Sequence, residues 1–353
     1  MARLERLYAA APPAGAELAA LGKPAGTLAM YLGRYPLAQA WLESSLAMAS
    51  AAGRSDLEAN LLGALGSLAT LRGELAAAAD WYGRSRDLCH RMRYRIGESY
   101  ALNNLGIVLQ EMGRPDEARQ HLQQALAMHR EASSPRDVAN SLMNLGDLEQ
   151  GLGRTAEAQA LYASSFGTLQ SLGDEWAAAY ARSGLAQCAL AEGELERAGT
   201  DFEAALLVLR RLGDQEAIAD QLEGLARVAW RQQRQAAAED LATECMALRL
   251  ALASPGPLAS GLETLAEVHA AHAPAAALRR LACAWRLREE AKLPASGARR
   301  QWLQALRAQL HSALGAAADA AEQAGRQADA ATLAATPAAL ETTPMAAPAP
   351  RAP

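Results

Sequence analysis

Aromatic residues are scarce in this chain of 353 residues, since phenylalanine, tyrosine and tryptophan together make up only 5% of it. Hydrophobic residues nevertheless reach 51%. A buried core therefore has to be built from alanine and leucine, which are strong helix formers. This composition predicts an all-α protein.

Cysteine is also rare, with four residues at Cys89, Cys188, Cys245 and Cys283. They lie far apart in the sequence and have neither the spacing of metal ligands nor that of a disulfide framework. We expect four buried thiols in a reducing compartment.

The chain has no excess of basic charge and no long apolar run. Its net charge is −5, with both signs mixed along the sequence, whereas nucleic-acid binding needs a cationic surface. No stretch approaches the roughly 18 apolar residues of a membrane span. Glu5, Arg6, two prolines and Glu17 near the start disfavour a signal peptide. We therefore expect a cytoplasmic protein with no nucleic-acid partner and no membrane partner.

Sequence motifs of catalysis are missing as well. The chain has no nucleophile elbow, no H-E-x-x-H and no dinucleotide fingerprint, and its one Gly-Lys pair, Gly22-Lys23, lacks a phosphate loop around it. His269 and His272 are three residues apart and could form a metal pair, but no carboxylate or thiol completes a site at suitable spacing. We predict no enzyme activity, no catalytic residue, no cofactor and no bound metal.

A period of 40 residues runs through most of the chain instead. Glycine recurs at Gly33, Gly73, Gly113, Gly153 and Gly193. Leucine recurs at Leu65, Leu105, Leu145, Leu185, Leu225 and Leu265, and alanine at Ala38, Ala78, Ala118, Ala158, Ala198 and Ala238. A fixed period between 20 and 50 residues is typical of a solenoid, in which each unit buries its apolar face on its neighbours.

Residues 99–135 show how one unit is built. An apolar stripe recurs at i, i+3, i+7 and i+10, on Leu102, Leu105, Leu109 and Met112, and predicts a first helix. Gly113 fits the left-handed residue that ends a helix, and Pro115 fits the start of the next one. The unit is therefore a helical hairpin.

Seven such hairpins are predicted, at 16–54, 57–95, 97–135, 137–173, 177–213, 217–253 and 258–292. Connectors that end in aspartate, such as those at Asp56, Asp174 and Asp214, suit the capping of the next helix. Gln233 replaces the turn glycine in the sixth unit. We predict a lead segment at 1–15, a solenoid at 16–292, capping helices at 293–335 and a disordered tail at 336–353.

The hairpins resemble the tetratricopeptide repeat, or TPR. That family has a Leu-Gly pair in its first helix, found here at 105–106 and 145–146, and an Ala-x-x-x-aromatic pattern in its second, found at Ala78/Tyr82, Ala158/Tyr162 and Ala198/Phe202. The closing proline is missing and the unit has 40 residues rather than 34, which implies longer helices or connectors. The resemblance implies a right-handed α-solenoid of about seven hairpins with a concave binding surface.

More narrowly, residues 217–315 look like the end of the TPR sensor arm in bacterial signal-transducing ATPases of the STAND type and in related transcriptional regulators. The nucleotide-binding motor and DNA-binding domain of those proteins have no counterpart in this sequence. The resemblance implies that the chain is a detached or truncated sensor arm in signal transduction.

Side chains opposite the leucine stripe of each first helix should line the concave surface. Side-chain amides there suit the gripping of a peptide backbone, because they both donate and accept hydrogen bonds. The alternative is that these amides are solvated or bridge adjacent helices. The predicted protein-binding or peptide-binding residues are Asn60, Tyr100, Asn103, Asn104, Glu111, Asn140, Asn144, Asp147, Gln187, Arg227 and Trp230.

Trp230 and a basic stretch near the end of the solenoid each have two interpretations. Trp230 could anchor a ligand or cover the glycine-free turn, and the basic stretch 279–307 could meet an acidic partner or be a solvated helix face.

The first functional hypothesis is a protein-binding or peptide-binding scaffold or adaptor. The second is the sensor arm, and the third is self-association through an uncapped end of the solenoid.

Overall fold

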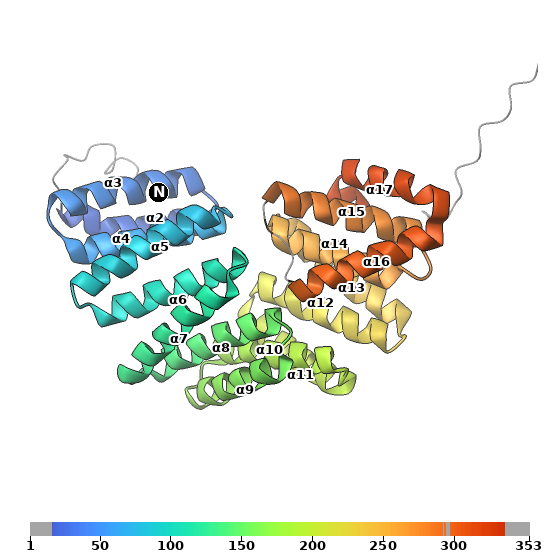
Figure 1. Cartoon of the computed structure of the whole chain (residues 1–353), viewed down its shortest axis with the longest axis horizontal. Helices are drawn as coiled ribbons and strands as arrows, with labels where there is room; N and C mark the ends of the chain where they lie inside the picture. Colours follow the sequence, from blue (N-terminus) through green and yellow to red (C-terminus); the bar gives the residue numbers. More distant parts are fainter. Residues whose placement is uncertain (1–15, 292, 294–296, 336–353) are drawn as a thin grey trace, which may run out of the picture. The chain divides into compact units, whose positions relative to one another are not determined.

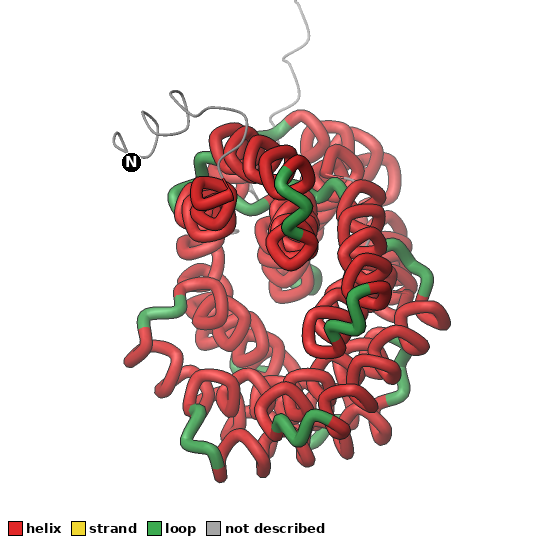
Figure 2. The backbone as a smooth tube through the Cα atoms, turned by 90° about the vertical axis from the view of Figure 1, so that its left-hand side faces the viewer, coloured by secondary structure: helices red, strands yellow, loops and turns green. Residues whose placement is uncertain are grey.

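The computed structural model describes residues 16–291, 293 and 297–335, and all regular elements within these ranges are helices. Figure 2 shows the helices joined by short loops. The predicted lead segment 1–15 and the predicted disordered tail 336–353 lie outside the described residues. No helix in the described part is long and apolar enough to cross a membrane.

The helices follow the order of the seven predicted hairpins along the chain (Figure 1), which confirms the predicted all-α repeat array. The helices that pack as pairs are α2 (Ala16–Tyr31) with α3 (Tyr35–Ala51), α4 (Ser55–Leu71) with α5 (Leu75–Arg91), α6 (Arg95–Glu111) with α7 (Pro115–Glu131), α10 (Glu175–Glu192) with α11 (Leu195–Leu212), α12 (Gln215–Arg231) with α13 (Gln235–Leu252), and α14 (Pro255–His269) with α15 (Pro274–Ala291). The fourth predicted hairpin contains α8 (Pro135–Gly151) and α9 (Thr155–Ser171). The predicted hairpins differ from these bounds by only a few residues.

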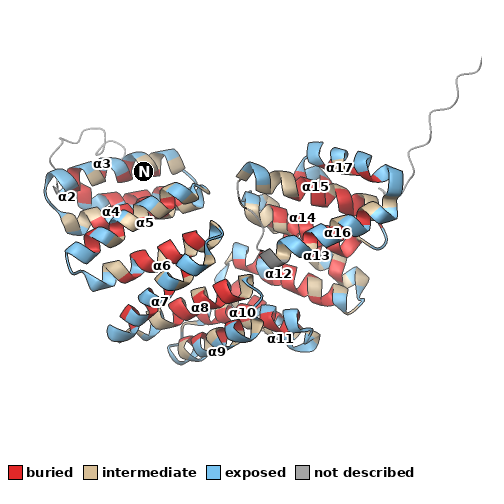
Figure 3. Ribbon diagram, viewed as in Figure 1, coloured by how far each residue is buried: buried red, intermediate tan, exposed pale blue. Residues whose placement is uncertain are grey.

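The array divides into two compact units, Met1–Leu148 and Glu149–Pro353, with the boundary inside α8. In each unit buried residues alternate with more exposed ones along most helices (Figure 3), whereas α14 is buried without interruption from Gly261 to His269. The first unit has a core that includes Leu42 and Leu61, and the second has one that includes Phe202 and Leu222. Leucine, alanine and a few aromatic rings therefore build both cores, as the composition predicts.

The left-handed turns recur at half the period of the hairpins. Residues with positive φ follow the helices at Gly33, Gly53, Gly73, Arg93, Gly113, Ser133, Gly153, Gly173, Gly193, Gly213, Gln233 and Ala253. Turns between hairpins thus have the same backbone conformation as turns within them. Most helices have 17 or 18 residues, so longer helices rather than longer connectors account for the length of the repeat.

The predicted aspartate caps are confirmed at two helices and wrong at a third. Asp174 and Asp214 accept hydrogen bonds from the backbone nitrogens of Ala177, at 3.2 Å, and Ala217, at 3.1 Å. Helix α4 begins one residue before Asp56, with Arg54 at its N-cap position. Asp56 therefore lies inside the first turn, where its carboxylate pairs with the Arg54 guanidinium at 2.8 Å.

Glycine in place of Ala253 is expected to stabilise the chain by about 0.5–1 kcal/mol. Ala253 has a φ of 54°, a conformation that costs an L-residue roughly 1–2 kcal/mol and glycine much less, although glycine gains entropy in the unfolded chain. The midpoint of urea denaturation measures the gain. Gly113→Ala is the converse control, because a Cβ there meets no atom within 4 Å and only the backbone cost remains. Equal midpoints for Ala253→Gly and wild type would contradict the prediction.

Three further helices follow the hairpins in the second unit: α16 (Gly297–Leu314), α17 (Ala318–Gln327) and α18 (Ala330–Ala335). Leu303, Leu306 and Leu310 of α16 share a buried cluster with Leu278 and Leu281 of α15. The last hairpin is thus covered by helix α16 on one side. The role of 293–335 as a cap stays a prediction.

Candidate functional site

In the first unit, several of the predicted amides make hydrogen bonds within the chain. The Asn144 side chain on α8 donates to Asn103 Oδ1 on α6 at 2.9 Å. Asn60 donates to the backbone oxygen of Asp56 on its own helix at 2.9 Å. The Asn103–Asn144 pair therefore bridges adjacent first helices, which is the alternative interpretation of these amides.

The other predicted residues of α6 and α8 differ in exposure. Tyr100 is 47% exposed and its hydroxyl donates to the Asp137 carboxylate at 3.2 Å. The remaining four are Asn104 and Asn140, which are half-buried, and Glu111 and Asp147, which are exposed. The structure thus places these residues on two neighbouring helices of the first unit.

In the second unit, the predicted residues Gln187 and Arg227 line a cavity of about 520 Å³. Trp230 does not line this cavity. It packs against Ala229, Ala238 and Val268, close to the turn at Gln233. This position favours the interpretation that the Trp230 ring covers the glycine-free turn.

Helices α10 to α14 and α16 all contribute to the cavity wall. Its charged residues are Glu216, Asp220, Glu223, Arg227, Arg231, Arg249, Glu267 and Arg299, and Trp302 adds an aromatic ring. A cavity of this volume is in the range of ligand-binding pockets, roughly 300–1,000 Å³. It is the candidate functional site.

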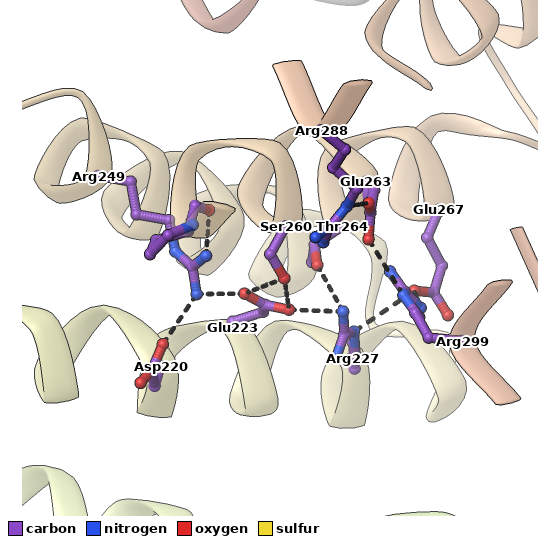
Figure 4. Close-up of polar contacts among 11 residues, drawn as sticks. Asp220, Glu223, Arg227, Arg249, Ser260, Glu263, Thr264, Glu267, Arg288 and Arg299 are labelled. Carbon is purple, nitrogen blue, oxygen red and sulfur yellow. Dashed lines mark hydrogen bonds and ion pairs between the residues drawn. The ribbon is translucent and has the colours of Figure 1, made fainter. Parts of the chain in front are cut away.

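Glu223 is the centre of a buried polar network at one side of the cavity (Figure 4). Arg249 of α13 donates to Glu223 and, at 3.0 Å, to Asp220. Ser260 of α14 donates to Glu223 Oε1 at 2.9 Å, and Arg227 pairs with the same carboxylate. Side chains from three helices therefore converge on one carboxylate.

A second pair of carboxylates extends this network toward α16 (Figure 4). Glu263 is fully buried and accepts from Arg288 at 2.6 Å and from Arg299 at 3.3 Å. Glu267 accepts from Arg299 Nη1 at 3.4 Å and lies 3.5 Å from Arg227 Nε. Arg227 and Arg299 thereby join the two halves of the network.

Glu223 stays charged despite its burial. Burial alone would raise the pKa of the Glu223 carboxyl, but the Arg227 and Arg249 guanidiniums lower it to about 2. Burial and the charge of Arg227 lower the pKa of Arg299, although a guanidinium stays protonated at neutral pH. Arg299 is therefore a cation of the cavity wall whose two carboxylate partners, Glu263 and Glu267, offset its burial only in part.

Arg299 also keeps an unused donor. No acceptor among the described residues takes a hydrogen bond from its Nη2 atom, which is buried. The guanidinium carbon of Arg299 lies 4.4 Å from the centre of the Trp302 ring, on the same helix. Arg299 therefore combines a buried, unused donor with an adjacent aromatic ring, and both residues line the cavity.

Sequence reasoning found only part of this site. The helical period places Asp220 and Glu223 on one face of a first helix, and Glu263 and Glu267 on one face of the next first helix, but it does not indicate their partners. For the basic stretch 279–307 the sequence left open an acidic partner or a solvated helix face, whereas Arg288 and Arg299 from that stretch bind carboxylates of the same chain. The partners lie 25 and 36 residues away in sequence, and no local pattern links them.

The sequence model of the tetratricopeptide repeat family matches residues 17–89 and 98–171. No curated protein matches the chain in sequence. Among solved structures, the Rap conjugation gene regulator of plasmid pLS20, in complex with the Phr* peptide, is similar with 16% identity and a TM-score of 0.64 over 76% of this chain and 73% of that one.

Two other solved structures have a similar fold. A Rap protein complexed with competence and sporulation factor has 12% identity and a TM-score of 0.66, over 88% of this chain and 96% of that one. A STAND protein with a tetratricopeptide repeat sensor, from Pyrococcus horikoshii, has 14% identity and a TM-score of 0.52. The match covers 70% of this chain and 38% of the Pyrococcus protein.

The similar folds and the family match agree with the repeat that the recurring glycine, leucine and alanine residues predict. The helical hairpins that this repeat builds continue beyond residue 171 to Ala291. Residues 17–89 and 98–171 of the chain are tetratricopeptide repeats.

Proposed function

We propose that this chain is a peptide-binding scaffold, and that the cavity of the second unit holds an acidic group of the bound segment. The observation that carries the proposal is the buried, unpartnered Nη2 donor of Arg299 in the cavity wall. A buried donor without an acceptor costs about 1–3 kcal/mol. A ligand carboxylate that accepts from it would recover this cost.

The charges around Arg299 support an acidic ligand. Four carboxylates and four guanidiniums make up the network: Asp220, Glu223, Glu263, Glu267, Arg227, Arg249, Arg288 and Arg299. Their formal charges cancel, so a ligand anion meets no net repulsion. Charge-assisted hydrogen bonds to guanidinium are also stronger than neutral ones. A carboxylate is therefore the group that fits the unused donor.

The size of the cavity supports a short segment rather than a folded domain. About 520 Å³ accommodates a few side chains. Gln187 on α10 adds an exposed amide at its wall, and amides suit a peptide backbone. The similar Rap conjugation regulator was solved with a peptide, which is consistent with this class of ligand.

Peptide selection on the full chain, followed by fluorescence polarisation with the selected peptides, tests the proposal. Arg299→Gln is expected to weaken binding about tenfold or more, since a hydrogen bond to a charged group contributes roughly 1.5–3 kcal/mol. Arg300→Gln, an exposed neighbour on the same helix, is the matched control and should bind like wild type.

The peptide supplies the second arm of this test. Changing its acidic residue to the corresponding amide should weaken binding to wild type but cause little further loss in Arg299→Gln. Circular dichroism of each variant checks that the fold is retained. Selected peptides that carry no acidic group and bind both proteins equally would overturn the assignment of the cavity.

The alternative function is the sensor arm of a STAND-type signalling protein. The likeness to the Pyrococcus protein supports the fold of such an arm, and the match covers 38% of that protein. The neighbouring coding sequence tests this alternative. A reading frame there with a phosphate-binding loop and a DNA-binding domain would favour the arm over a separate scaffold.

A further inference from the structure

Three potential metal ligands meet at the turn of the seventh hairpin, outside the charged cavity. They are Glu239 of α13, His269 at the end of α14 and His272 in the turn that follows. Each of them offers a ligand atom within 4.8 Å of those of the other two. The sequence shows the histidine pair alone, because Glu239 comes from an earlier helix.

The distance between the ligand atoms of His272 and Glu239 fits one small cation. His272 Nε2 lies 3.1 Å from Glu239 Oε1. In a tetrahedral zinc site, bonds of about 2.0–2.2 Å place two ligand atoms roughly 3.3 Å apart. The ring centre of His269 lies 5.3 Å from that of His272, and its ligand atom lies within 4.8 Å of the other two, so metal binding requires these atoms to approach by up to about 1.5 Å.

His269 offers a ring nitrogen that makes no hydrogen bond. The residue is only 6% exposed, and its Nδ1 atom has no hydrogen-bond partner among the described residues. An imidazole nitrogen without such a partner can coordinate a metal ion.

Gln235 orients the other two ligands. Its side-chain nitrogen lies 2.7 Å from Glu239 Oε1, 3.3 Å from His272 Nδ1 and 3.0 Å from the backbone oxygen of Val268. An amide nitrogen has two hydrogens for these three acceptors, so one acceptor is left over. With Nδ1 of His272 accepting from Gln235, its Nε2 carries the proton toward Glu239, where a metal ion would replace it.

We propose that Glu239, His269 and His272 bind one zinc ion, which fastens the turn of the last hairpin to α13. Two imidazoles and one carboxylate form a ligand set that zinc uses, with water at the fourth position. His272 and Glu239 are about 40% and 39% exposed, so the ion can reach the site from solvent. The nearby Arg280 disfavours a cation, and the Glu239 charge offsets it.

The turn between α14 and α15 lacks a backbone feature that the other turns of the array have. Between α14 and α15, no described residue has the positive φ that closes every earlier turn of the hairpin array. The turn is also one residue shorter than the period predicts, since Ala277 rather than residue 278 follows Ala238 in the alanine column. A metal that joins His269 and His272 to α13 would hold it in place of the missing left-handed residue.

Zinc binding to the intact, EDTA-treated chain tests the proposal by isothermal titration calorimetry. Wild type is expected to bind one equivalent and to melt at a higher temperature when zinc is present, since the ion binds the folded state. His272→Ala and Glu239→Gln should each weaken binding roughly tenfold or more. Both side chains are partly exposed, so both variants are expected to fold.

Two matched controls separate this site from general surface binding. Glu244→Gln changes an exposed carboxylate on the same helix, and His90→Ala changes an exposed histidine of the first unit that pairs with Glu98. Both should bind zinc like wild type. Cobalt provides an independent readout through its visible absorption, which should show nitrogen and oxygen ligands.

The proposal fails if wild type binds no stoichiometric zinc, or if binding survives both His272→Ala and Glu239→Gln. A thiolate charge-transfer band with cobalt would also overturn it, because one of the four buried cysteines would then be the ligand. The zinc site and the peptide cavity share no residue, so either proposal can fail without the other.

Discussion

Glutamine in place of Glu223 is expected to lower the free energy of unfolding by about 3–5 kcal/mol, the usual cost of breaking a buried ion pair from one side. Glutamine keeps the size of the side chain but removes its charge. Arg249 is only 3% exposed, so its charge would lose its main partner without gaining water. The midpoint of urea denaturation, followed by circular dichroism, measures the loss.

Two further variants show whether the loss comes from the uncompensated charge. Glu216→Gln, on an exposed carboxylate of the same helix, should change stability by less than about 0.5 kcal/mol. Glu223→Leu combined with Arg249→Met removes both charges and should be more stable than the sum of the single losses predicts, by roughly 1–3 kcal/mol. Strict additivity would show that the two residues are not coupled.

Alanine in place of Gly224 is the second substitution with a large expected effect, a loss of about 1–3 kcal/mol from overpacking. A Cβ at this position of α12 would lie 2.5 Å from Cε1 and 2.7 Å from Cε2 of Phe202. Phe202 is only 1% exposed and packs in the same core, so its ring can move away from a new Cβ only toward the cavity that it lines together with Gly224. The clash outweighs the better helix propensity of alanine.

The same substitution at Gly167, from glycine to alanine, should raise the free energy of unfolding instead of lowering it. A Cβ on Gly167 of α9 meets no atom within 4 Å, and alanine there should stabilise the helix by about 0.5–1 kcal/mol. Phe202→Leu, which shortens the ring side chain, should rescue Gly224→Ala in the double variant. Both effects are read from urea denaturation midpoints, and a Gly224→Ala protein as stable as Gly167→Ala would contradict the packing argument.

The repeat fold could be predicted from the sequence because its determinants are local and periodic. Gly113 and Pro115 indicate a turn wherever they stand, and the leucine stripe indicates the buried face. The pairing of α12 with α13 then follows from a short connector. Arg93, Ser133 and Ala253 show the limit of this reasoning, since their left-handed conformation has no glycine to indicate it.

The candidate sites could be predicted less well, because their members meet only through packing. Glu223 and Arg227 share one helix face, and the periodicity of α12 places them together. Arg299 and Trp302 come from α16. The spacing of residues in the sequence does not predict where this helix packs on the last hairpin. Glu239 likewise reaches His269 from a different helix, so a search for metal ligands within one helix misses it.

The spacing of the left-handed residues at half the hairpin period has a consequence for how such an array changes in length. A duplication or loss of half a period would keep every turn in place but would put a second-helix sequence where a first helix belongs. The leucine columns and the amide-bearing faces would then exchange sides over the rest of the chain. Only a duplication or loss of a full period keeps both the turns and the side-chain pattern in place. The sequence unit that can be duplicated is therefore twice as long as the spacing between the left-handed turns.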